Sequence, residues 1–77
     1  MHAIDFELEP GRDFVELNQL LKLAGVVDSG GAGKQLVASG AVQVDGELEL
    51  RKTAKIRAGQ VVALDDIAIR VHPGAPA

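Results

Sequence analysis

The sequence predicts an α+β protein in which two short helices pack on a small, mostly antiparallel sheet. Three observations indicate this fold class. Apolar and polar residues alternate over residues 4–8, as they do in a half-buried strand. Apolar residues then follow a helical spacing over residues 14–24 and again after Ser29. Finally, turn residues at 45–46 and 65–66 separate alternating segments that we expect to form hairpins.

The first strand is predicted where Ile4, Phe6 and Leu8 alternate with acidic residues, just before Pro10-Gly11. A period of two places these three side chains on one face, which we expect to be buried. The opposite face carries carboxylates. A straight strand does not converge its ligands as a calcium loop does, so we interpret this face as solvated. Its residues are Asp5, Glu7 and Glu9.

Two helices are predicted next. Asp13 and Glu16 have the spacing of a capping box, and the apolar stripe that follows predicts a first helix over residues 14–24. Ser29 is expected to cap a second helix, which ends at Gly40. Each glycine within a helix costs about 1 kcal/mol relative to alanine. The start of the second helix should therefore depend on tertiary packing, because it contains Gly30, Gly31 and Gly33.

Two hairpins are predicted in the second half of the chain. Asp45-Gly46 readily supplies the positive φ angles of a two-residue turn, so residues 42–44 should pair with 47–49. After a basic segment, residues 60–64 and 67–72 are expected to form a second antiparallel pair.

Length and composition indicate one domain. The chain has 77 residues, of which 47% are hydrophobic and 25% charged, as in ordinary globular proteins. We expect residues 1–72 to form a single domain and the Pro- and Gly-rich residues 73–77 to form a flexible tail. The absence of cysteine excludes disulfides and thiolate metal sites. No signal-peptide pattern or apolar run of about 18 residues is present, so we expect a cytoplasmic protein.

The residue inventory argues against catalysis. The chain holds two histidines, no cysteine and no tyrosine, and its serines stand only at positions 29 and 39. The run from Gly30 to Lys34 invites a phosphate-loop interpretation. That loop needs a glycine where Asp28 stands and a serine or threonine where Gln35 stands. We therefore expect no enzyme, no catalytic residue, no metal and no cofactor.

Charge is distributed unevenly along the chain. The net charge is −3, yet residues 34–57 hold five cations and three acids, a balance of +2, which leaves −5 for the rest. Four of these cations lie within residues 51–57. Such a run is more often a solubilising loop than a binding site, and composition alone does not decide between them. Phe6 and Phe14 are both expected in the core, so base stacking is not the expected mode of any nucleic-acid binding.

The order of elements resembles a known family. A helix ending at Gly25 and a short helix opened by Ser29 precede Gly40-Ala41-Val42-Gln43-Val44-Asp45-Gly46, a basic stretch and Ile56-Arg57-Ala58-Gly59-Gln60-Val61-Val62. This arrangement resembles the S-four RNA-binding domain, or αL motif, named for the fourth protein of the small ribosomal subunit. It is most similar to the stand-alone bacterial YbcJ-like subgroup. The resemblance covers about residues 14–64.

The resemblance implies both a binding surface and a function. In the family, basic side chains from the second helix and from the loop after the hairpin face RNA. This chain departs from the family pattern at Gly30, where a basic residue is frequent, and at Asp45-Gly46, where Asn-Gly is frequent. The implied RNA-binding surface consists of Lys34, Arg51, Lys52, Lys55 and Arg57.

We therefore expect a non-enzymatic, monomeric module that docks on structured RNA, such as ribosomal or transfer RNA. No membrane and no small-molecule substrate are expected as partners. The alternative is a protein–protein interaction domain that keeps the fold and uses its acidic strand face or apolar surface to bind a protein.

Overall fold

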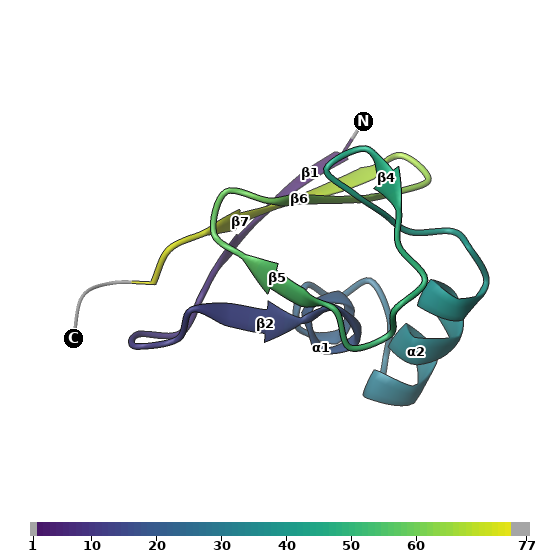
Figure 1. Cartoon of the computed structure of the whole chain (residues 1–77), viewed down its shortest axis with the longest axis horizontal. Coiled ribbons are helices and arrows are strands. Elements are labelled where there is room, and N and C mark those ends of the chain that lie inside the picture. The colour runs from purple at the N-terminus through teal and green to yellow at the C-terminus, as the bar shows by residue number, and fades with distance from the viewer. Residues whose placement is uncertain (1, 75–77) are drawn as a thin grey trace.

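The computed structural model describes residues 2–74, which form two sheets and two helices (Figure 1). A five-stranded sheet has the order β1-β7-β6-β3-β4, and β2 and β5 form a separate two-stranded sheet. The helices lie together on one side of the larger sheet, beside the smaller one (Figure 1). In chain order the elements are β1 (His2–Glu7), β2 (Phe14–Glu16), α1 (Leu17–Leu23), α2 (Gly30–Ala38), β3 (Gln43–Val44), β4 (Glu47–Leu48), β5 (Lys55–Arg57), β6 (Val61–Leu64) and β7 (Ile67–His72).

The pairing within the larger sheet confirms the predicted fold class. Strand β1 runs parallel to β7, and the other neighbouring strands are antiparallel. Both predicted hairpins are present, as β3–β4 and β6–β7. Asp45 and Gly46 adopt φ angles of 52° and 83°, the left-handed values that a two-residue hairpin turn requires. The Asp-Gly pair therefore fixes the β3–β4 turn as predicted.

One apolar core joins the sheets to the helices. Helix α1 contributes Leu17, Leu20 and Leu21, all fully buried, and α2 contributes Val37. The buried face of the larger sheet supplies further aliphatic side chains, and strand β5 adds Ile56. Burial of these groups is the main favourable contribution to folding in so small a domain.

The predicted start of the first helix is wrong. Residues 14–16 form strand β2, and the helix begins three residues later, at Leu17. Glu16 occupies the N-cap position and its side chain makes no capping hydrogen bond, so the predicted capping box with Asp13 is absent. Strand β5 draws these residues into a sheet, because Val15 lies opposite the buried Ile56.

Backbone carbonyl groups that are distant in the sequence accept hydrogen bonds from the first amides of α1, in place of a side-chain cap. The amide of Leu17 donates to the carbonyl of Ala54 at 2.9 Å, and the amide of Asn18 donates to the carbonyl of Lys52 at 3.0 Å. The first amides of a helix have no partner within the helix and must be satisfied by another group. Here the chain after β4 supplies those acceptors, which ties it to the helix.

The second helix begins as predicted. The hydroxyl of Ser29 accepts a hydrogen bond from the amide of Ala32 at 3.1 Å. The glycines allow close approach to α1, most clearly at Gly33. A Cβ atom built at Gly33 would lie 2.6 Å from the carbonyl oxygen of Asn18. The packing of α1 and α2 therefore requires glycine at this position.

The C-terminal strand ends beside the end of β1, because the two strands run parallel and His72 lies opposite Glu7. Gly74 packs against the carbonyl groups of Leu8 and Glu9. Residues 75–77 of the predicted flexible tail lie outside the described residues. Within residues 2–74, no helix is long and apolar enough to cross a membrane.

Candidate nucleic-acid interface

The basic segment over residues 51–57 combines a loop with a strand. Ala54 and Ile56 face the core and are buried, whereas Lys55 and Arg57 are exposed. This alternation is the period of two expected for a strand with one buried face. The strand was not among the sequence predictions, because four cations in seven residues hide its apolar positions. The segment therefore presents its cations outward from a fixed backbone.

Four of the five predicted site residues line one open hollow with a volume of about 710 Å³. Lys34 comes from α2, Arg51 and Lys52 come from the chain between β4 and β5, and Lys55 is the first residue of β5. No carboxylate is among the residues that line it. We call this feature the basic hollow, and its lining consists of Lys34, Leu50, Arg51, Lys52, Thr53, Ala54 and Lys55.

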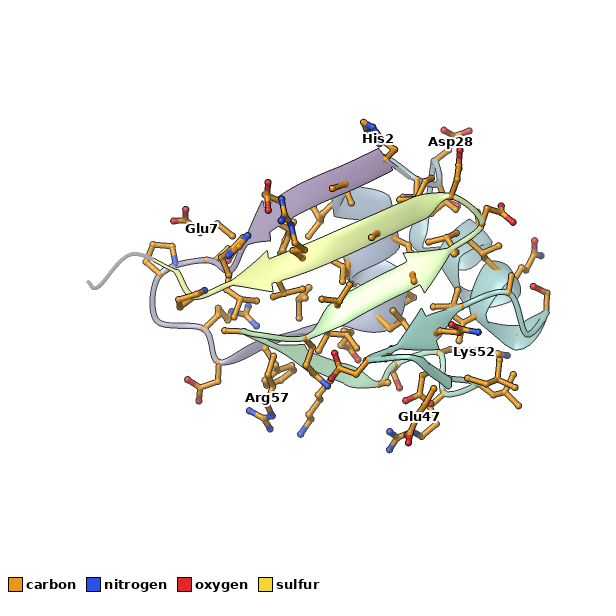
Figure 2. The ribbon with its side chains drawn as sticks, turned by 90° about the horizontal axis from the view of Figure 1, so that it is seen from above. His2, Glu7, Asp28, Glu47, Lys52 and Arg57 are labelled. Carbon is orange, nitrogen blue, oxygen red and sulfur yellow. The ribbon has the colours of Figure 1, made fainter. Side chains whose placement is uncertain are left out.

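Arg57 lies outside the basic hollow but extends the same surface. It stands two residues after Lys55 on the exposed face of β5. Both cations flank the ring of Phe14, with Lys55 Nζ 5.0 Å and Arg57 Cζ 5.7 Å from the ring centroid. Figure 2 shows Lys52 and Arg57 along one edge of the molecule, with Glu47 at that edge as well. The cations thus form a band of two parts. One part is the basic hollow, the other is the Phe14 ring with its two neighbouring cations, and Lys55 belongs to both.

The prediction that Phe14 belongs to the core is wrong. Its side chain is half-buried and lies opposite Arg57 in the β2–β5 pair. Neighbouring residues of a strand face opposite sides of its sheet. Val15 therefore turns toward the core, and Phe14 turns toward the cations. Phe6, in contrast, packs against the core as predicted.

Arg51 differs from the other four cations because it is already paired. Its guanidinium donates two hydrogen bonds to Glu49, one from Nη2 to Oε1 at 2.9 Å and one from Nε to Oε2 at 3.1 Å. The amide of Arg51 also donates to Glu49 Oε2 at 3.0 Å. These bonds lower the pKa of the Glu49 carboxyl below its ordinary value, because they stabilise its charged form.

Asp45 has a structural role that its sequence context did not indicate. Its carboxylate accepts hydrogen bonds from the amide of Val61 at 2.9 Å and from the Gln60 side chain at 3.3 Å. The Gln60 side chain in turn accepts from the amide of Arg57 at 2.7 Å. Asp45, which stands where Asn is frequent in the family, thus links the β3–β4 turn through Gln60 to the end of β5.

The described part of the chain holds no cluster of metal ligands. No group of three or more His, Asp or Glu side chains within residues 2–74 is arranged to hold a metal ion. Backbone hydrogen bonds, aliphatic contacts and the two helices instead position a band of cations. The chemistry that this arrangement supports is non-covalent recognition of anionic groups.

Comparison with known proteins identifies the family. The S4 domain model matches residues 6–72. The chain belongs to the S4 domain family. YbcJ of Escherichia coli strain K12, provisionally named an RNA-binding protein, is 47% identical over 57 residues, which cover 74% of this chain and 81% of YbcJ. YbcJ of Shigella flexneri matches to the same extent.

A solved structure confirms the fold of this S4 domain protein. The solution structure of E. coli YbcJ, described as revealing an αL motif involved in RNA binding, aligns with a TM-score of 0.71 at 40% identity. The alignment covers 94% of this chain and 90% of that one. The resemblance drawn from the sequence is therefore confirmed at the level of family and fold.

Proposed function

We propose that this protein is a non-enzymatic module that docks on structured RNA through Lys34, Arg51, Lys52, Lys55 and Arg57. The observation that carries the proposal is the basic hollow, in which cations from α2, from the chain after β4 and from the start of β5 meet without a carboxylate in the lining. The relationship to YbcJ, whose solved structure is described by an RNA-binding motif, supports the same function.

The net charge of −3 does not oppose this function. At physiological salt, exposed charges interact over about 8 Å before screening removes most of their effect. The molecule measures 36 × 25 × 20 Å, so acidic groups away from the band contribute little to the field that a phosphate meets there. The local arrangement of charge therefore governs binding.

The five side chains have different roles in the proposed complex. Lysine attracts a phosphate as a point charge, whereas arginine can donate two parallel hydrogen bonds to it. Lys34, Lys52 and Lys55 would supply attraction, and Arg57 would fix orientation from the end of β5. Arg51 would contact phosphate only by releasing Glu49 or by using the donors that Glu49 leaves free. The backbone of α2 and β5 fixes the positions from which Lys34, Lys55 and Arg57 project, which suits the phosphate pattern of a folded RNA better than that of a mobile strand.

Salt dependence of RNA affinity tests the mechanism. If five phosphates are contacted, a plot of log affinity against log salt should have a slope of about −3.5 to −4.5. The triple variant Arg51→Ala, Lys52→Ala, Lys55→Ala should make that slope shallower by about 2.1–2.7. Fluorescence anisotropy with a hairpin RNA over a salt series measures both quantities.

The control is Lys22→Ala, which removes an exposed cation of α1 that does not line the basic hollow. This variant should keep the wild-type slope. A slope near zero in the wild-type protein would exclude phosphate recognition. Unchanged binding of the hairpin RNA by the triple variant would exclude this surface as the RNA-binding site.

A further inference from the structure

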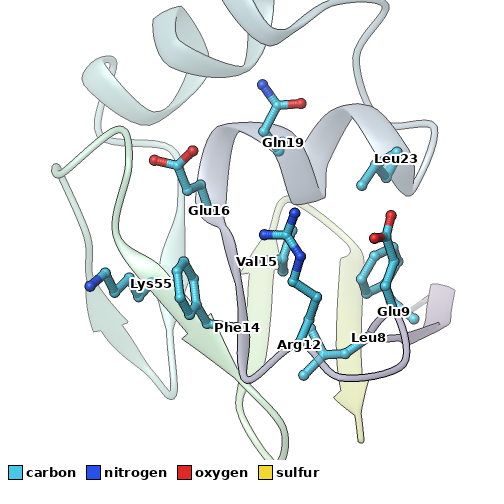
Figure 3. Close-up of a pocket in the computed structure, with 10 residues that line it drawn as sticks. Leu8, Glu9, Arg12, Phe14, Val15, Glu16, Gln19, Leu23 and Lys55 are labelled. Carbon is cyan, nitrogen blue, oxygen red and sulfur yellow. The ribbon is translucent and has the colours of Figure 1, made fainter. Parts of the chain in front are cut away.

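We propose that a second hollow, beside Phe14, binds an unpaired nucleobase of the docked RNA. This inference rests on the proposed RNA-binding function and adds a base-recognition site to a surface that otherwise reads phosphates. The hollow has a volume of about 430 Å³, within the range of about 300–1,000 Å³ typical of small-ligand pockets. We call it the Phe14 hollow (Figure 3).

The Phe14 hollow adjoins the basic hollow through one residue. Lys55 lines both of them. The nucleotide whose phosphate binds Lys55 would therefore lie at the mouth of the Phe14 hollow. This shared residue makes the occupant part of the same RNA rather than an independent ligand.

The walls of the Phe14 hollow suit the flat apolar face of a base. Phe14 is half-buried and stands apart from the residues that form or pack against the core. Val15 and Leu23 also line the hollow, and Leu23 is 57% exposed although it is aliphatic. In Figure 3 the Phe14 ring lies beside Lys55, with Arg12 on the other side of the β2 ribbon. An aromatic ring beside cations is the arrangement that proteins use to stack single bases.

Polar side chains of the Phe14 hollow could bind the edge of a base. Glu16, Gln19 and Arg12 all line it, and Figure 3 shows them around its opening. Within residues 2–74, neither Glu16 nor Arg12 forms an ion pair. An ionised carboxylate only accepts hydrogen bonds, and Arg only donates them. The Watson–Crick edge of every nucleobase, uracil included, carries both donors and acceptors, so an unpaired base can satisfy both groups.

The occupant must be unpaired. In a duplex, the hydrogen-bonding edge of each base is already used, and A-form helices hide their bases from side chains in a deep, narrow groove. A bulged or looped nucleotide can leave the stack and enter a hollow next to the phosphates. The structure thus favours a folded RNA that carries an extruded nucleotide where it meets Lys55.

The test compares three hairpin RNAs at low salt. The first has one bulged adenosine, the second has an abasic nucleotide at the bulge, and the third is fully paired. We expect the bulged RNA to bind about 5- to 150-fold more tightly than the abasic one, the range measured for base stacking on aromatic side chains.

Two variants assign any preference to the ring. Phe14→Leu keeps an apolar side chain but removes the aromatic face, so the advantage of the bulged RNA should fall to about twofold or less. Phe14→Tyr keeps the ring and should retain the advantage. Two-dimensional amide NMR spectra report whether each variant is folded. In the wild-type protein, the Gln19 side-chain amide should shift with bulged RNA but not with abasic RNA.

The outcomes separate this inference from the proposed function. Equal affinity for all three RNAs, lost in the triple variant Arg51→Ala, Lys52→Ala, Lys55→Ala, would overturn the base site and leave phosphate recognition intact. Retention of the bulge preference by Phe14→Leu would also overturn the base site. No binding of any hairpin RNA would overturn both proposals.

Discussion

The outer faces of the two sheets both carry charged side chains, but only one of them pairs its charges. On the β1–β7 pair, Asp5 lies opposite Arg70 and accepts hydrogen bonds from it and from His72, with Arg70 Nε 3.0 Å and His72 Nε2 2.8 Å from Asp5 Oδ1. On the β2–β5 pair, Lys55 and Arg57 lie near the ring of Phe14, and neither forms an ion pair within residues 2–74, although Glu16 lies opposite Lys55. The first face offsets its own charge, whereas the second leaves cations available for a partner.

The two faces also differ in what brings their charged groups together. The charged cluster on the larger sheet belongs to two strands in register, so sheet pairing alone brings it together. The basic hollow combines one residue of α2 with the chain after β4. Its geometry therefore depends on the close contact between α1 and α2 and on the carbonyl groups that cap α1.

The largest expected effect comes from Gly33→Ala. The new Cβ atom would meet the carbonyl oxygen of Asn18 at 2.6 Å, so α2 must shift away from α1. Inserting a methyl group into such a tight contact costs about 1–3 kcal/mol in the free energy of unfolding. We also expect weaker RNA binding, because Lys34 is the next residue. Urea denaturation and anisotropy measure the two effects.

Gly31→Ala is the matched control, because its nearest contact would be an ordinary 3.9 Å from the Ser29 hydroxyl. This change should stabilise the protein by about 0.4–1 kcal/mol, since alanine restricts the unfolded chain. If both variants had the same stability, the α1–α2 contact would not set the geometry of the hollow.

A smaller effect is expected from Glu49→Gln. This change removes the carboxylate that pairs with Arg51, so the basic surface would differ still more from the β1–β7 face, where Asp5 and Arg70 are paired. Glu49 holds Arg51 in two side-chain hydrogen bonds, and Arg51 remains 80% exposed. Removing the negative charge should free Arg51 and tighten RNA binding by about two- to fivefold. Glu47→Gln removes a nearby charge that forms no ion pair within residues 2–74, so it should have a smaller effect. Equal gains from the two variants would mean that Arg51 is not restrained by its pair.

The smallest expected effect concerns Asp5. Hydrogen bonds from His72, and then from Arg70, lower the pKa of its carboxyl below the ordinary value of 3.8. A carboxyl whose pKa is lowered by folding stabilises the protein above its unfolded-state pKa. That contribution disappears as the pH falls through the folded-state pKa. Asp5→Asn should therefore lower the Tm slightly near neutral pH, and the difference should vanish in acid.

Thermal unfolding of wild type and Asp5→Asn over a pH series checks this expectation. Asp13→Asn is the control, because Asp13 forms no ion pair in the described part of the chain. A difference in Tm between wild type and Asp5→Asn that persisted below the folded-state pKa would contradict a role for the Asp5 charge.

Local sequence patterns were sufficient to predict several elements. Asp45-Gly46 has its own preference for positive φ, and Ser29 needs only its neighbouring amides to cap α2. The alternation of Ile4, Phe6 and Leu8 likewise determines which face of β1 turns inward. These features depend on residues within a few positions of one another, so the amino-acid order alone specifies them.

Only the tertiary structure decided the start of α1 and the environment of the cations. Residues 14–16 satisfy both a helical and an extended pattern, and their pairing with β5, about forty positions away, selects the strand. The same pairing exposes Phe14 beside Lys55 and Arg57. The sequence by itself determined the family and the number of basic groups on the segment. Long-range backbone pairing, whose partners no local pattern specifies, decided which of those charges lie beside Phe14 and which adjoin a hollow.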